Sequence, residues 1–120
     1  MKKILIVDDD DHMRILITTV FKASGFEMME ADNGGDALEM IKNNSPDLII
    51  SDVMMDNMNG FMLREELKSD PKLANIPFIL MTGMAMTAGA WEADPTVGYI
   101  VKPFIMPDLL AIVEKKLSSV

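Results

Sequence analysis

The chain has 120 residues, of which 49% are hydrophobic, and its formal net charge is −8 at pH 7. This length predicts one domain with a single core, extending over residues 1–120. The negative charge argues against direct nucleic-acid binding, because phosphate contacts need clustered Lys and Arg. The sequence has no cysteine, which excludes disulfides, thiolate metal sites and a cysteine nucleophile. No stretch approaches the roughly 20 apolar residues of a membrane span, and no signal peptide is evident, so we expect a cytoplasmic protein.

Short apolar runs alternate along the chain with segments of helical periodicity. Residues 4–7 are Ile-Leu-Ile-Val, a run without polar alternation that is typical of a strand buried on both faces. Apolar residues then recur at three- and four-residue spacing from Met13 to Phe21, which predicts a helix that Gly25 ends. The later predicted elements are a weak edge strand at 26–30, a helix opened by the turn 33–35, a buried strand at 48–52, a helix beginning at Gly60, a strand at 78–82, a poor helix within 83–95, a strand at 99–101 and a last helix beginning at Pro107.

Five strands alternating with five helices predict a flavodoxin-like α/β fold. Right-handed crossovers place the helices on both faces of a five-stranded parallel sheet. The strand order 2-1-3-4-5 fits best, with the first and third strands in the middle. Because the winding reverses between these two strands, we expect a ligand-binding crevice at their carboxyl ends.

Polar residues follow four of the predicted strands. Asp8 and Asp9 follow the first, Asp52 ends the third, Thr82 ends the fourth and Lys102 follows the fifth. Each has a simple structural explanation by itself, as an acidic helix start, a turn residue or a surface cation. Together, however, the carboxylates would repel one another unless a cation held them. Ligands that are all oxygen favour a hard divalent ion, Mg²⁺ before Ca²⁺.

This set of residues predicts phosphoryl chemistry. A Mg²⁺ ion held by a few carboxylates keeps coordination positions for water and phosphate oxygens. Lys102 would add a positive charge and Thr82 a hydroxyl donor. Asp52 could then accept a phosphoryl group as an acyl phosphate. His12 falls outside the strand ends and is expected to be a solvated residue of the first helical turn.

Several motifs occur in a fixed order along the chain. They are residues 4–9, 31–34 with 37–38, 46–52, Met55 with Gly60, 81–82, and 99–104. With these motifs the sequence resembles the receiver domains of two-component response regulators, and is similar to the single-domain chemotaxis regulators. The flavodoxin-like strand order is the one known for that family.

The resemblance implies a role for each strand-end acid. Asp52 would be the phosphoacceptor, receiving its group from a phosphohistidine on a histidine kinase or phosphotransfer protein. Asp9 and Asp52 would bind Mg²⁺ directly, the backbone carbonyl of Met54 would complete the protein ligands, and Asp8 would act through water. Such a domain is not an enzyme acting on other substrates, although it catalyses its own phosphoryl transfer and slow autodephosphorylation.

The resemblance also implies a conformational switch. Thr82 would turn toward the phosphoryl group, Lys102 would bridge to it, and Tyr99 would move inward with Thr82. Phosphorylation would thereby shift the population between two arrangements of the last strand ends. A purely structural role remains the alternative for Tyr99, because strand aromatics often pack in the core.

The signal of such a domain is expected to pass to another protein. We expect a face within 83–120 to bind a downstream protein target or a fused output domain, and this face could also form a homodimer. It would consist of the apolar segment after Thr82, with Met84, Met86 and Trp91, together with the fifth strand and the last helix. Asp56 stands where the family usually has a proline. One alternative function is a phosphate-independent receiver-like interaction module. Another, an aspartyl phosphatase, would need a second Asp two residues after Asp52, where this chain has Met54.

Overall fold

The computed structural model describes residues 1–55, 58–83 and 96–118. Its five strands form one parallel sheet in the order β2-β1-β3-β4-β5. The strands are β1 (Lys3–Val7), β2 (Glu27–Ala31), β3 (Leu48–Asp52), β4 (Phe78–Thr82) and β5 (Val97–Val101). The described helices are α1 (Asp11–Ala23), α2 (Gly34–Asn43), α3 (Gly60–Lys68) and α4 (Met106–Ser118).

The predicted flavodoxin-like fold and its strand order are confirmed. Four helices lie in the described part of the chain, so the count of five does not hold there; the helix expected within 83–95 falls almost wholly outside it. The boundaries differ slightly from the expected ones. The last strand begins at Val97 rather than at Tyr99, and the last helix begins at Met106 rather than at Pro107.

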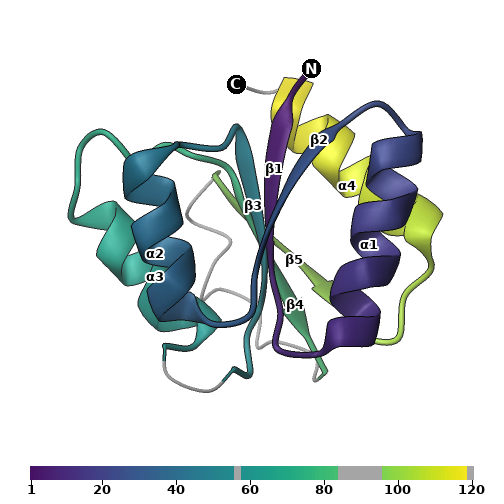
Figure 1. Cartoon of the computed structure of the whole chain (residues 1–120), viewed down its shortest axis with the longest axis horizontal. Helices are drawn as coiled ribbons and strands as arrows, with labels where there is room; N and C mark the ends of the chain where they lie inside the picture. The colour runs from purple at the N-terminus through teal and green to yellow at the C-terminus, as the bar shows by residue number, and fades with distance from the viewer. Residues whose placement is uncertain (56–57, 84–95, 119–120) are drawn as a thin grey trace.

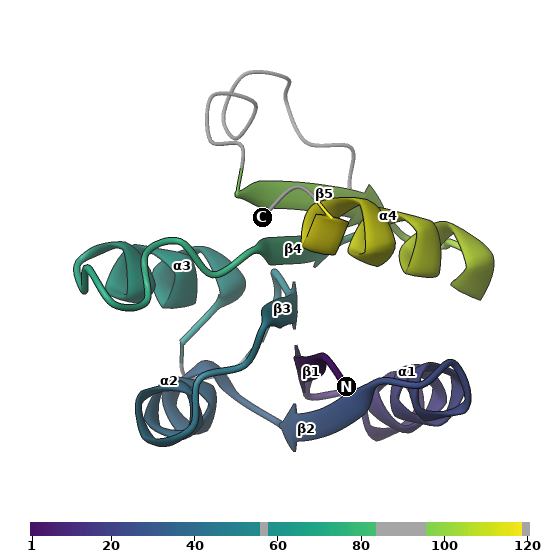
Figure 2. The same cartoon turned by 90° about the horizontal axis from the view of Figure 1, so that it is seen from above.

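Helices cover both faces of the sheet, as Figure 2 shows, with α2 and α3 on one side and α1 and α4 on the other. Alternate residues of a strand point to opposite faces, so each central strand contributes side chains to two hydrophobic clusters, one on each face of the sheet. In β1, Leu5 packs toward α2 and α3, whereas Ile4 packs with Phe21 of α1. This double burial explains why the central strands have no polar alternation.

The helices α1, α2 and α3 begin close to the carboxyl ends of the strands (Figure 1), and a side-chain cap starts each of them. The carboxylate of Asp10 accepts hydrogen bonds from the backbone N–H groups of His12 and Met13 at the start of α1. Asn33 and Asn59 cap α2 and α3 in the same way. Because capping groups satisfy otherwise unpaired N–H donors, the caps fix the point at which the chain turns after β1, β2 and β3.

Gly60, the first residue of α3, lies against the backbone at the end of β3. A Cβ atom there would lie 2.6 Å from the carbonyl oxygen of Asp52 and 2.8 Å from Cδ2 of Leu80. We expect Gly60→Ala to lower the free energy of unfolding by roughly 1–3 kcal/mol, because the backbone oxygen cannot yield easily. Urea denaturation measures this change. Gly83→Ala is the control, since a Cβ at Gly83 would meet no atom of the described residues within 4 Å, and equal losses in both variants would contradict the explanation.

Candidate functional site

The acidic residues predicted at the strand ends lie together. Carboxylate oxygens of Asp8, Asp9 and Asp52 all lie within 4.8 Å of one another, and among the described residues this is the one group of acidic or histidine side chains close enough to share a metal ion. Lys102 reaches the same point from the end of β5. Its Nζ lies 3.1 Å from Oδ2 of Asp52 and 4.0 Å from Oδ2 of Asp8. Three separate parts of the chain therefore meet at one edge of the sheet.

Asp52 is the last residue of the buried central strand β3, and its side chain is held from two sides. Its Oδ1 accepts a long hydrogen bond of 3.4 Å from the backbone N–H of Met54, and its Oδ2 accepts one from Lys102. The side chain of Met54 is exposed beside it. Asp52 is thus buried, and its carboxylate lies close to the amine of Lys102 and to the neighbouring acids.

Asp8 is fully buried, and its two carboxylate oxygens have different surroundings. Oδ1 accepts a hydrogen bond of 2.9 Å from the backbone N–H of Asp10, whereas Oδ2 has no hydrogen-bond partner among the residues that the structure describes. The pKa of Asp8 is raised to about 6, mainly by burial; the hydrogen bond from the Asp10 N–H and the charge of Lys102 lower it, whereas the charge of Asp52 raises it. A buried carboxylate oxygen that accepts no hydrogen bond from the described residues is a group that a bound cation would compensate.

The raised pKa of Asp8 predicts a pH-dependent stability. Its folded-state pKa lies above the ordinary value, so its protonation favours the folded state at low pH, and this contribution is lost as the pH rises through about 6. Asn cannot ionise and avoids this loss. In the absence of divalent cations, we expect Asp8→Asn to raise the free energy of unfolding at about pH 7.5 by on the order of 2–3 kcal/mol relative to wild type, and by little at about pH 4.

Urea denaturation in EDTA at several pH values tests this expectation. Asp32→Asn is the matched control, because Asp32 is an exposed acid just after β2. The free energy of unfolding of Asp32→Asn should not increase comparably relative to wild type as the pH rises. An Asp8→Asn protein no more stable than wild type at neutral pH would mean that burial of the Asp8 carboxylate has no energetic cost.

Thr82 and Tyr99 lie on the two strands that lead to Lys102. Thr82 is buried at the end of β4, and its carbonyl oxygen accepts a hydrogen bond of 2.6 Å from the backbone N–H of Lys102. Tyr99 is paired with Leu80 in the sheet, half-buried, and packs against the hydrophobic cluster under α2 and α3. This packing matches the core alternative for Tyr99, and the switch role of both residues stays a prediction.

The remaining residues named in the sequence analysis either lie apart from the acidic group or fall outside the described residues. His12 is exposed in the first turn of α1 and is not part of the acidic group. Asp56 and the apolar residues Met84, Met86 and Trp91 lie outside the described residues. The 83–120 face proposed for partners is therefore described only in part.

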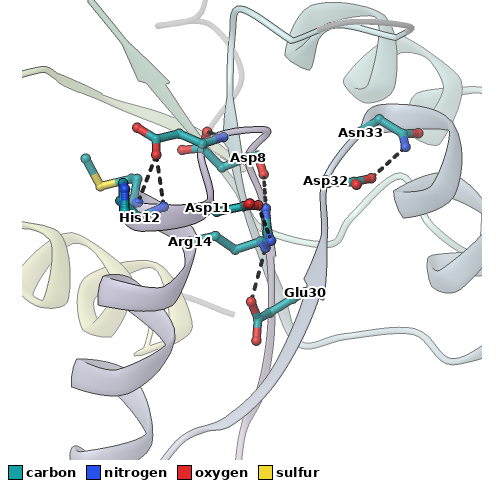
Figure 3. A network of polar contacts seen from close by, with 9 residues as sticks. Asp8, Asp11, His12, Arg14, Glu30, Asp32 and Asn33 are labelled. Carbon is teal, nitrogen blue, oxygen red and sulfur yellow. Dashed lines mark hydrogen bonds and ion pairs between the residues drawn. The ribbon is translucent and has the colours of Figure 1, made fainter.

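Arg14 is a site neighbour that the sequence interpretation missed. Its guanidinium donates to the carbonyl oxygen of Asp8 at 2.8 Å, to Asp11 at 2.6 Å and to Glu30 at 3.1 Å (Figure 3). The three-residue spacing of Asp11 and Arg14 on a helix could have suggested their ion pair. The contacts with Asp8 and Glu30 depend on where β2 and α1 lie relative to β1, which local spacing does not reveal.

Fold and site together define a class of protein: a doubly wound α/β domain with an acidic site and a lysine at the carboxyl ends of its central strands. Comparison with known proteins identifies the family within this class. The model of the response regulator receiver domain family matches residues 4–114, and the chain belongs to this family. It is a receiver domain of two-component signal transduction.

Both single-domain proteins and much longer proteins are among the relatives that match the chain. The chemotaxis protein CheY of Bacillus subtilis strain 168 is 36% identical over 118 residues, covering 97% of this chain and 98% of CheY. The regulatory protein AtoC of Escherichia coli strain K12 is 36% identical over 119 residues, covering 98% of this chain and 25% of AtoC. The chain thus spans nearly all of one relative and a quarter of the other.

Solved structures agree with the fold. The signal receiver domain of a histidine kinase from Syntrophus aciditrophicus has a TM-score of 0.88 at 31% identity, covering 100% of this chain and 92% of that chain. CheY4 of Vibrio cholerae has a TM-score of 0.88 at 28% identity, covering 97% of this chain and 98% of that chain.

Within the described residues, no helix has both the length and the apolar character needed to cross a membrane.

Proposed function

We propose that Asp52 accepts a phosphoryl group from a phosphohistidine of a histidine kinase or phosphotransfer protein, in a reaction that requires Mg²⁺. The observation that carries this proposal is the contact of 3.1 Å between the Lys102 amine and an Asp52 carboxylate that has two further carboxylates within 4.8 Å. The whole chain, residues 1–120, is proposed to form this one receiver domain. ATP, from which a kinase makes its phosphohistidine, is a cytoplasmic metabolite, so we place the domain in the cytoplasm.

The donor set at the site fits Mg²⁺. It contains only oxygen ligands, and Oδ2 of Asp8 is buried with no hydrogen-bond partner among the described residues. In the proposed site Asp9, Asp52 and the backbone carbonyl of Met54 would hold the ion directly, and Asp8 would act through water. When bound, Mg²⁺ supplies positive charge that offsets the charge on the carboxylates and on the phosphoryl oxygens.

The protein groups have distinct roles in the proposed transfer. A carboxylate oxygen of Asp52 attacks phosphorus, the phosphorus–nitrogen bond of the donor breaks, and its electron pair stays on the imidazole nitrogen, which takes up a proton. The amine of Lys102 stabilises the negative charge on the phosphoryl oxygens during transfer. The Thr82 hydroxyl is a further donor to those oxygens. Slow autodephosphorylation by water, catalysed by the same residues, would reset the domain.

Phosphorylation is proposed to act on partners through a shift between two conformations. The backbone hydrogen bond from the N–H of Lys102 to the carbonyl oxygen of Thr82 joins the ends of β4 and β5. A phosphoryl group that draws both side chains inward would therefore move both strand ends. Tyr99 would follow Thr82. The output is proposed to be a downstream protein, a fused output domain or a second copy bound through the 83–120 face.

Intact-protein mass spectrometry tests the proposal. After incubation with acetyl phosphate and Mg²⁺, the protein should gain the mass of one phosphoryl group, and EDTA should prevent the gain because the carboxylates then repel the donor. Beryllofluoride with Mg²⁺, an acyl-phosphate mimic, should also change the fluorescence of Trp91, the one tryptophan of the chain. Absence of both responses would favour the phosphate-independent interaction module instead.

A further inference from the structure

The backbone of Asp8, at the end of β1, is tied to the end of β2 by two contacts, one direct and one through Arg14. The N–H of Asp8 donates to the carbonyl oxygen of Ala31 at 3.1 Å. The carbonyl oxygen of Asp8 accepts from Nη1 of Arg14 at 2.8 Å, and Nε of Arg14 donates to Glu30, the residue before Ala31, at 3.1 Å. The four residues therefore form a closed ring of contacts that joins β1, α1 and β2; Figure 3 shows the part of it made by Asp8, Arg14 and Glu30.

Arg14 suits this position because its guanidinium is planar and carries several donors. Three of its nitrogens face three different acceptors: the Asp8 carbonyl, Glu30 and Asp11. Two of these acceptors are carboxylates, and charge-assisted bonds of this kind are roughly twice as strong as neutral ones. A lysine has one compact charged group and cannot reproduce this fork. The side chain is also mostly buried, with 16% of it exposed, which favours a single conformation.

The carbonyl of Asp8 belongs to the peptide bond that leads to Asp9. Because a peptide bond is planar, fixing this oxygen fixes the plane and the starting direction of Asp9. The acids of the site repel one another, and a loop free to move would relieve that repulsion by swinging Asp9 away from Asp52. The ring opposes such movement, since the Asp8 backbone is held on both its N–H and its C=O side.

We infer that Arg14 is a positioning residue for Mg²⁺: through the Asp8 backbone it holds Asp8 and Asp9 at the distance from Asp52 that the ion needs. This inference rests on the proposed function, because it assumes that the acidic site binds the ion. Outer contacts that orient metal ligands typically change metal affinity about 10–100-fold when they are removed.

The sign of the effect distinguishes positioning from simple electrostatics. Arg14→Gln removes a positive charge near the acids, which by charge alone would tighten Mg²⁺ binding. If Arg14 positions the ligands, the same substitution weakens binding, by about tenfold. Arg14→Lys keeps the positive charge but loses the planar set of donors, so it should weaken Mg²⁺ binding as well. Lys3→Gln is the matched control for charge, because Lys3 lies at the other end of β1 and contacts Glu27 and Asn44 instead.

The experiment is a titration of the full chain with MgCl₂ at constant ionic strength, followed by NMR of the backbone amides of residues 8–10, with a urea denaturation curve for each variant. We expect weaker binding in both Arg14 variants and unchanged or slightly tighter binding in Lys3→Gln. Unchanged or tighter binding in Arg14→Gln, or wild-type affinity in Arg14→Lys, would overturn the inference. If Arg14→Gln does not fold, Arg14→Lys decides. Wild-type protein that does not bind Mg²⁺ would instead overturn the proposed function.

Discussion

Asp52→Asn is expected to abolish the phosphoryl adduct that acetyl phosphate and Mg²⁺ form on the wild-type protein. The amide has nearly the same shape, and its one carbonyl oxygen can still accept a hydrogen bond from either Met54 or Lys102, so the fold should persist. It lacks, however, the anionic oxygen that attacks phosphorus, and no acyl phosphate can form on it. Intact-protein mass spectrometry measures the adduct directly in both proteins under identical conditions.

Asp10→Asn is the matched control for this experiment. Asp10 carries the same charge in the neighbouring loop, is not part of the acidic group, and caps α1, a role that Asn fills equally well. The control should keep the adduct. An adduct that survives Asp52→Asn would show that another acid accepts the phosphoryl group, with Asp9 the first candidate because of its proximity.

Lys102→Met is expected to slow phosphorylation of Asp52 about 100-fold, the loss typical of removing one preorganised donor to a developing charge. Methionine keeps an unbranched side chain of similar length but cannot neutralise phosphoryl oxygens. The Lys102 amine, 3.1 Å from Asp52, is placed to do so without rearrangement. The measurement is the rate of adduct formation at fixed acetyl phosphate concentration.

The assay needs saturating Mg²⁺, because removing a cation from the site would itself change affinity for the ion. Lys68→Met is the control, since Lys68 is a half-exposed cation on α3 that forms an ion pair with Glu65 at 4.0 Å, away from the acidic site. That variant should react at the wild-type rate. A rate for Lys102→Met within about threefold of wild type would exclude a role for Lys102 in the transfer itself.

The sequence was sufficient to predict the strand order and to predict that the acids and the lysine after the strands lie together. The apolar runs at 4–7 and 48–50 lack alternation because both faces of a central strand are covered, and this is a local signal that needs no coordinates. Parallel strands joined by helices bring all carboxyl ends to one edge, so Asp8, Asp52 and Lys102 could be grouped from their places after the strands alone.

Tertiary structure decided how these residues differ from one another. Asp8 is buried with a raised pKa whereas its neighbour Asp9 is exposed, although the two are identical side chains in adjacent positions. The contact between Arg14 and Glu30 and the close approach of Gly60 to Asp52 were likewise unpredicted. Periodicity records which face of an element is buried, but distances between side chains on different elements depend on strand register, sheet twist and helix placement. Those quantities arise from packing of the whole chain, and only the folded structure contains them.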